Sequence, residues 1–113
     1  MANMEQGEQN LEMEKLIVFK DEMRKFSEDE AVSGKTSHLA GFNSEDLNIE
    51  DMYMWQTLKN FKDGDDVKVL KNYFNNYRLS LESVNPMNAS RGQFSGLVAN
   101  KIYIISLEDE LNR

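Results

Sequence analysis

The sequence predicts an all-α fold, a small bundle of three to four helices, and two observations carry this prediction. Apolar residues recur three or four apart without a break along one segment, at Val67, Leu70, Phe74, Tyr77, Leu81 and Val84. Only a helix places such positions on one face, and the polar residues between them indicate that the opposite face is exposed to solvent. Strand character is confined to residues 101–107, and an isolated strand would lack a partner.

The length of 113 residues fits one domain with one core. Residues 1–9 contain Gly7 and a run of acids and amides, and we expect a disordered N-terminal tail there, with a single helical domain over residues 10–113. The apolar share of 40% is sufficient for a globular core, while charged residues at 29% indicate a large wetted surface.

Two helices are expected in the first half of the chain. The first runs from Asn10 to Glu28, and the pattern lapses into a loop over residues 29–43. The second starts at Ser44, whose hydroxyl can cap it, or at Asn48 together with Asp51, and it runs to about residue 61.

The second half holds two more expected helices. The sequence Asp63–Asp66 is a turn in which Gly64 can take positive φ, and the third helix follows from Val67 to Ser83, ending before Pro86. A linker is expected over residues 87–93. From Phe94 onward the spacing and type of the apolar residues fit either a helix or a strand. We favour a helix, and the β-branched residues at 101–107 leave a strand as the alternative.

Charge is unevenly distributed along this chain of net charge -7. Residues 1–30 carry nine acids and four bases, and residues 45–66 carry seven acids and two bases. Residues 67–107 carry five bases and one acid. The plainest interpretation is that acidic helices lie beside a basic one and their fields largely cancel; the alternative is a basic face for a polyanion.

No motif predicts catalysis, a metal or a cofactor. There is no cysteine, and His38 is the single histidine. The sequence Gly34-Lys35-Thr36 lacks the upstream glycine of a phosphate-binding loop, because Asp29 stands there. The acids of 63–66 lack the later ligands of a calcium loop, so helix capping explains them better. We therefore expect no catalytic residue, no metal site, no cofactor and no enzymatic activity.

Four bulky residues in succession, Met52, Tyr53, Met54 and Trp55, cannot all face one core from a single helix. We interpret them as a partner interface, used for docking another protein or for self-association into a homo-oligomer. The alternative is that this helix is central and is surrounded on all sides.

The sequence thus favours a non-catalytic protein–protein interaction module, an inhibitor, adaptor or assembly accessory that also uses its acidic surface. A bacteriophage or mobile-element origin fits its size but rests on no residue. The alternative function is nucleic-acid or nucleotide binding through bases and a ring in the basic segment, namely Lys68, Lys71, Tyr73, Arg78, Arg91 and Lys101. No apolar run exceeds four residues, so we expect no membrane span and a cytoplasmic protein.

Overall fold

The computed structural model describes residues 2–32, 41–84 and 88–112, with side chains from residue 11 to residue 30 and throughout the two later ranges. It contains four α-helices and one 3-10 turn in these ranges, and no strand. The helices are α1 (Ala2–Val32), α2 (Ile49–Lys59), α3 (Val67–Glu82) and α4 (Ala89–Leu111), and the turn η2 (Ser44–Asp46) precedes α2. The predicted all-α bundle is confirmed.

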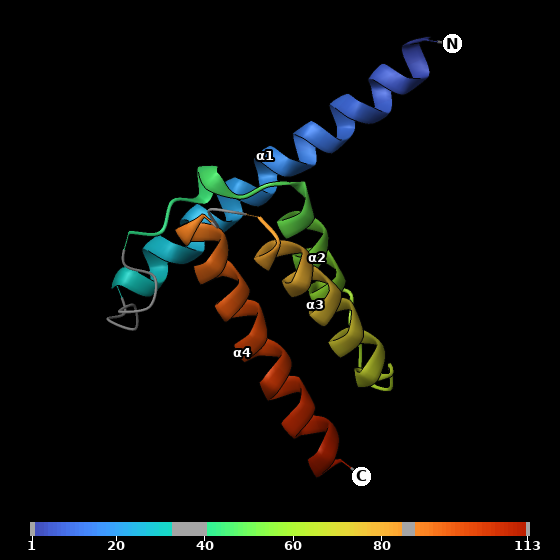
Figure 1. Ribbon diagram of the computed structural model, residues 1–113, viewed down its shortest axis with the longest axis vertical. Coiled ribbons are helices and arrows are strands. Elements are labelled where there is room, and N and C mark those ends of the chain that lie inside the picture. Colours follow the sequence, from blue (N-terminus) through green and yellow to red (C-terminus); the bar gives the residue numbers. More distant parts are fainter. Residues whose placement is uncertain (1, 33–40, 85–87, 113) are drawn as a thin grey trace.

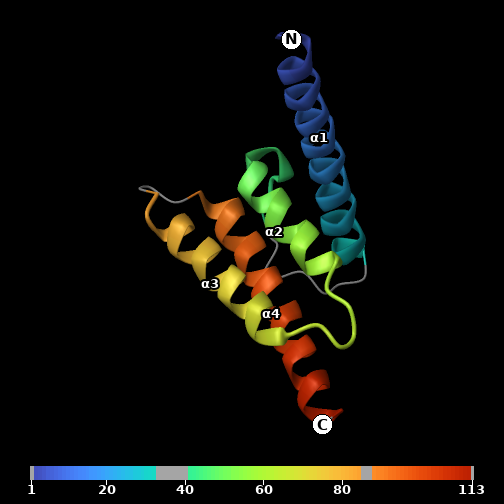
Figure 2. The same ribbon diagram turned by 90° about the vertical axis from the view of Figure 1, so that its right-hand side faces the viewer.

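Helices α2, α3 and α4 run alternately down, up and down as sequential neighbours, and α1 crosses their upper end (Figure 1). The amino-terminal half of α1 projects beyond the other helices at one end of the molecule, and the carboxyl-terminal part of α4 reaches the opposite end (Figure 2). The Cα radius of gyration is 15.7 Å, against about 13 Å for a compact domain of this length. The two projecting helix ends account for this elongation.

The core lies where all four helices meet. Phe94 of α4 is fully buried at its centre, with its ring 5.6 Å from that of Phe19 in an edge-to-face pair and 6.0 Å from that of Trp55. The other buried apolar side chains of this cluster are Met23 from α1, Leu47, Met52, Met54 and Leu58 from the α2 region, Leu70, Phe74, Tyr77 and Leu81 from α3, and Val98 and Ile102 from α4.

The predicted third helix is confirmed almost to the residue. It begins at Val67, and the carboxylate of Asp66 caps it by accepting a hydrogen bond of 2.9 Å from the amide of Lys68. Gly64 has φ +95° in the turn before it, as the turn requires. The predicted helix stop at Asn85 and Pro86 lies outside the described residues.

Other boundaries differ from the predictions. Helix α1 covers residues 2–9, where we expected a disordered tail, because Ala2, Met4, Glu5 and Gln6 are good helix formers and only Gly7 opposes them. It also continues past Glu28 to Val32, so the predicted loop starts four residues later, and the rest of that loop up to residue 40, with His38 and the Gly34-Lys35-Thr36 sequence, lies outside the described residues.

The starts of α2 and α4 also differ. Ser44 begins the 3-10 turn, which Asn43 caps, and α2 starts at the second predicted position, with Asn48 and Asp51 forming a reciprocal capping box. Helix α4 begins at Ala89, within the predicted linker, because Asn88 caps it. The alternative of a strand at 101–107 is wrong: this segment is helical and packs Ile102 into the core.

Candidate functional site

The four Met and aromatic side chains of α2 do not form one surface. Met52, Met54 and Trp55 are 1%, 0% and 8% exposed, whereas Tyr53 is 38% exposed. Of the four residues of the predicted interface only Tyr53 is exposed, because α2 lies against α1, α3 and α4 and its bulky residues fill the core on several sides, as the alternative of a central helix supposes. The hydroxyl of Tyr53 donates a hydrogen bond to the Glu12 carboxylate of α1, which raises the pKa of Tyr53.

The basic set is also divided. Arg91 is buried, and the ammonium of Lys101 lies over the rings of Phe26 and Trp55 at 5.7 Å and 5.8 Å from their centroids. Arg78 forms an ion pair of 3.5 Å with Glu82 on the surface of α3. Tyr73 lines a depression between α2 and α3, and Lys68 and Lys71 remain exposed. The structure does not gather the six residues into one polyanion-binding face.

A buried polar cluster joins the amino-terminal ends of α2 and α4. The carboxylate of Asp51, which is 0% exposed, accepts hydrogen bonds from the Tyr77 hydroxyl at one oxygen and from Arg91 Nε, at 2.9 Å, at the other. The second oxygen also accepts the backbone amide of Asn48 at 2.8 Å. Arg91 Nη2 donates to the Asn48 side chain at 3.1 Å and to the Glu50 carboxylate at 3.3 Å.

Burial and partnership together set the ionisation of this cluster. Desolvation, reinforced by the hydrogen bond to Asp51, raises the pKa of Tyr77 far above its ordinary value, so the phenol stays protonated. Desolvation acts to lower the pKa of Arg91, but the hydrogen bond and the charge of Asp51 outweigh it and raise this pKa. The guanidinium and the phenol therefore both act as hydrogen-bond donors to one carboxylate.

This cluster is built to hold helices together. Both oxygens of Asp51 are occupied, and among the described residues every buried side-chain nitrogen or oxygen has a hydrogen-bond partner. A second contact links the same two segments: the backbone amide of Asn43 donates a hydrogen bond of 3.0 Å to the Ser90 hydroxyl. The cluster fixes the segment before α2 against the start of α4.

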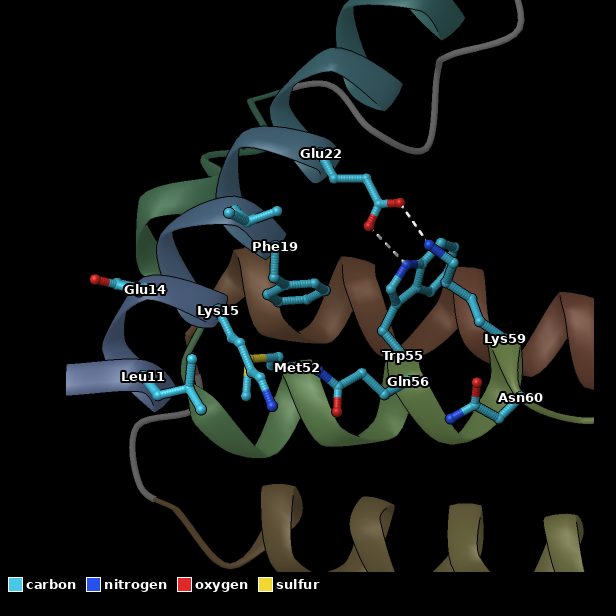
Figure 3. Close-up of a pocket in the computed structure, with 11 residues that line it drawn as sticks. Leu11, Glu14, Lys15, Phe19, Glu22, Met52, Trp55, Gln56, Lys59 and Asn60 are labelled. Carbon is cyan, nitrogen blue, oxygen red and sulfur yellow. Dashed lines mark hydrogen bonds and ion pairs between the residues drawn. The ribbon is translucent and has the colours of Figure 1, made fainter. Parts of the chain in front are cut away.

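An open groove lies between α1 and α2 (Figure 3). Its volume is about 620 Å³. Phe19, Met52 and Trp55 form its apolar floor, and Leu11 and Val18 of α1 line its edge. Leu11 and Val18 are 51% and 68% exposed, and Lys15 lies between them in the lining of the groove.

The polar side of the groove is organised by Glu22. Its two carboxylate oxygens accept hydrogen bonds from Trp55 Nε1 at 3.1 Å and from Lys59 Nζ at 2.8 Å, as the dashed lines in Figure 3 show. The tryptophan ring is thereby held from its nitrogen side by Glu22, while Lys101 lies over the ring. Contacts from Glu22 and Lys101 thus hold the Trp55 ring in the floor of the groove.

No protein-family model, no curated protein and no solved structure matches this chain. Within the described residues, no three histidine, cysteine, aspartate or glutamate side chains come together as a metal site would require. None of the helices in the described ranges is both long and apolar enough to cross a membrane.

Sequence reasoning missed the roles of Arg91 and Glu22. Arg91 stands 40 residues from Asp51, and nothing in its neighbourhood distinguishes a buried arginine from an exposed one. Glu22 resembles the other acids of a charged helix face. The signals that were present are the buried Tyr77, whose hydroxyl needs a partner, and Trp55, whose ring nitrogen needs an acceptor.

Proposed function

We propose that this chain is a non-catalytic module that binds a protein partner along the groove between α1 and α2 and the projecting half of α1. The observation that carries the proposal is the apolar floor of the groove, Phe19 and Trp55, together with the exposed apolar side chains Leu11 and Val18 that line it on α1. An amphipathic helix inserts its apolar face into a groove of this kind.

The charge on the projecting half of α1 indicates the chemistry of the partner. Residues 2–14 carry four glutamates and no lysine or arginine. A partner with basic residues beside its apolar anchors fits this acidic helix, and its binding should weaken as salt screens the charges.

A binding role is also favoured by the state of the buried ionisable groups. The buried carboxylate of Asp51 accepts hydrogen bonds at both oxygens, and Glu22, one of two carboxylates that line the groove, is engaged by Trp55 and Lys59. A general acid or base must be free to exchange a proton with a substrate. These carboxylates instead fix the positions of their neighbours.

The chain offers a matched pair of variants to test the groove. Val18 and Ile17 are adjacent and 68% and 65% exposed, but Val18 lines the groove and Ile17 does not. We expect V18K to weaken capture of the partner about tenfold or more, because a lysine placed among buried apolar contacts costs over about 1.4 kcal/mol. I17K adds the same charge and should leave capture unchanged.

The measurement is quantitative mass spectrometry of proteins retained from an extract of the source organism by immobilised wild type, V18K and I17K. It is made at about 50 mM and about 500 mM salt, a range over which the Debye length shortens from about 14 Å to about 4 Å. The supporting result is a protein retained by wild type and I17K, lost with V18K and reduced at high salt. Equal retention by V18K and I17K contradicts a role for the groove.

A further inference from the structure

The outward face of α4 carries a group of exposed apolar side chains that has no function in the chain's own core. Tyr103, Ile104, Leu107 and Leu111 are 62%, 45%, 41% and 84% exposed. Their spacing places them on one face of the helix, opposite Val98 and Ile102, which pack into the core. In Figure 1, α2 and α3 lie on the same side of α4, and no element lies on its other side along the carboxyl-terminal half.

The amino-terminal half of the same face is hollow. Gly96 is exposed in the middle of α4, and a Cβ added to it would meet no atom within 4 Å. A depression of about 440 Å³ lies there, lined by Gln93, Gly96, Leu97 and Asn100. A glycine inside a helix costs about 1 kcal/mol relative to alanine, and packing within the chain gives no reason for it.

This face is also free of charge. From Gly92 to Leu107 the only charged residue is Lys101, and its ammonium turns toward the rings of Phe26 and Trp55. Two copies of a chain with net charge -7 repel each other wherever acidic surfaces meet. The outward face of α4 is a long helical surface on which two copies can touch without bringing acids together.

We propose that two copies of the chain pair through α4 in antiparallel orientation, with the twofold axis at Asn100. This register sets Gly96 of each copy opposite Ile104 of the other, and Ala89 opposite Leu111. Each hollow position then receives a bulky side chain, and the two Asn100 amides meet and can hydrogen-bond to each other. The contact is the same on both copies, as a twofold interface requires.

Sequence spacing and electrostatics agree with this pairing. The positions on this face, 89, 93, 96, 100, 104, 107 and 111, are three or four residues apart, as on the contact faces of helices that pair along their length, and the order of the steps is symmetric about residue 100. Antiparallel helix dipoles attract, and the last-turn acids Glu108 and Glu110 come near the amino-terminal end of the partner's α4. A parallel pair would place bulky side chains against each other and leave both hollows empty.

The first test is sedimentation equilibrium of the full chain between about 5 and about 500 µM, which covers the affinities expected of a small interface. We expect a monomer–dimer equilibrium that L107E shifts toward monomer by about tenfold or more. The matched control is L79E, because Leu79 is a 64% exposed leucine on α3 and its substitution leaves the α4 face intact.

A second variant separates pairing from folding. G96L fills the hollow with a side chain that meets nothing in its own chain, so it should raise the melting temperature of the monomer while weakening the dimer. A monomer at every concentration, or a dimer that survives L107E and G96L, overturns the proposal.

The register is tested by single cysteines, because the chain has none of its own. Under mild oxidation N100C should form a disulfide-linked dimer and L107C should not, since the twofold axis brings only residue 100 beside its own copy. Cross-linking at both positions indicates a parallel pair and overturns the antiparallel register. V18K, which tests the α1 groove, should leave the dimer unchanged, so the two proposals fail independently.

Discussion

Among single residues, Asp51 has the most demanding environment in the molecule. Its carboxylate is 0% exposed, and it is stabilised by donors from three places in the chain: the amide of Asn48, the hydroxyl of Tyr77 and the guanidinium of Arg91. Removing one partner of a buried ion pair costs about 3–5 kcal/mol, because the other charge remains buried without compensation. Loss of any one of these donors should therefore destabilise the arrangement of α2, α3 and α4 that brings them together.

Tyr77 gives the sharpest prediction at this scale. Y77F removes the hydroxyl that donates to Asp51 and should lower the free energy of unfolding by about 1–3 kcal/mol at neutral pH. Urea unfolding followed by circular dichroism measures the change, and Y103F, at a tyrosine that is 62% exposed, is the control with little expected effect.

The same substitution tests the raised pKa of Tyr77. Burial keeps the phenol protonated in the folded state, whereas in the unfolded state it loses its proton above about pH 10. Its contribution to stability is thus complete below pH 10 and declines above it, by up to about 1.4 kcal/mol per pH unit. Between pH 10 and 11.5 the wild type should lose stability more steeply than Y77F, and equal slopes would contradict a protonated buried phenol.

The contacts of single residues can be predicted from the sequence only in part. The apolar stripe of α3 correctly predicts that Tyr77 is buried, but the stripe says nothing of what its hydroxyl contacts. The apolar period of α4 is regular only from Phe94 onward, so the sequence predicts Arg91 in a linker and on a polyanion surface, whereas the helix begins at Ala89 and buries Arg91. Partners 26 and 40 residues away cannot be identified from local spacing.

On the scale of elements, helix starts are defined by asparagine and aspartate caps. Asn48 and Asn88 cap α2 and α4 with the same hydrogen-bond pattern, since the side chain of each accepts from the backbone amides two and three residues later. Asn48 has an additional role, since its side-chain oxygen also accepts from Arg91. The start of α2 is therefore both a helix cap and part of the buried cluster.

These two caps form a matched pair of variants. N88A should lower the free energy of unfolding by about 1 kcal/mol, which is the usual contribution of a helix cap. N48A should lower the free energy of unfolding by about 0.5–1.5 kcal/mol more, because the guanidinium of Arg91 also loses a hydrogen bond. Thermal or urea unfolding measures both, and an N48A variant no less stable than N88A would show that the contact with Arg91 contributes nothing.

Element boundaries are predictable where cap and periodicity coincide. Helix α3 has Gly64 and Asp66 before it and a regular apolar stripe within it, so both its start and its face follow from the sequence. Helix α1 extends at both ends beyond its apolar period, and helix α4 begins before its apolar period, at the Asn88 cap, in a turn that buries the polar side chains Ser90 and Arg91. The groove arises between two helices, and its existence depends on their packing angle, which the sequence does not specify.

At the scale of the whole molecule, one core joins all four helices through Phe94. F94A should lower the free energy of unfolding by about 3–5 kcal/mol, because the ring is fully buried against Phe19 and Trp55. In the wild type, Trp55 fluorescence reports this junction and far-ultraviolet circular dichroism reports all the helices. The two probes should give coincident urea transitions, and separate midpoints would show that the chain unfolds in more than one unit.

The position of Phe94 has a consequence for synthesis. Helix α4 is the last of the four to leave the ribosome, yet it supplies the ring on which Phe19 and Trp55 pack and the guanidinium that neutralises Asp51. Until α4 emerges, Phe19, Trp55 and the Asp51 carboxylate lack the partners that α4 supplies. The core that joins the four helices can therefore be completed only after α4 has been synthesised.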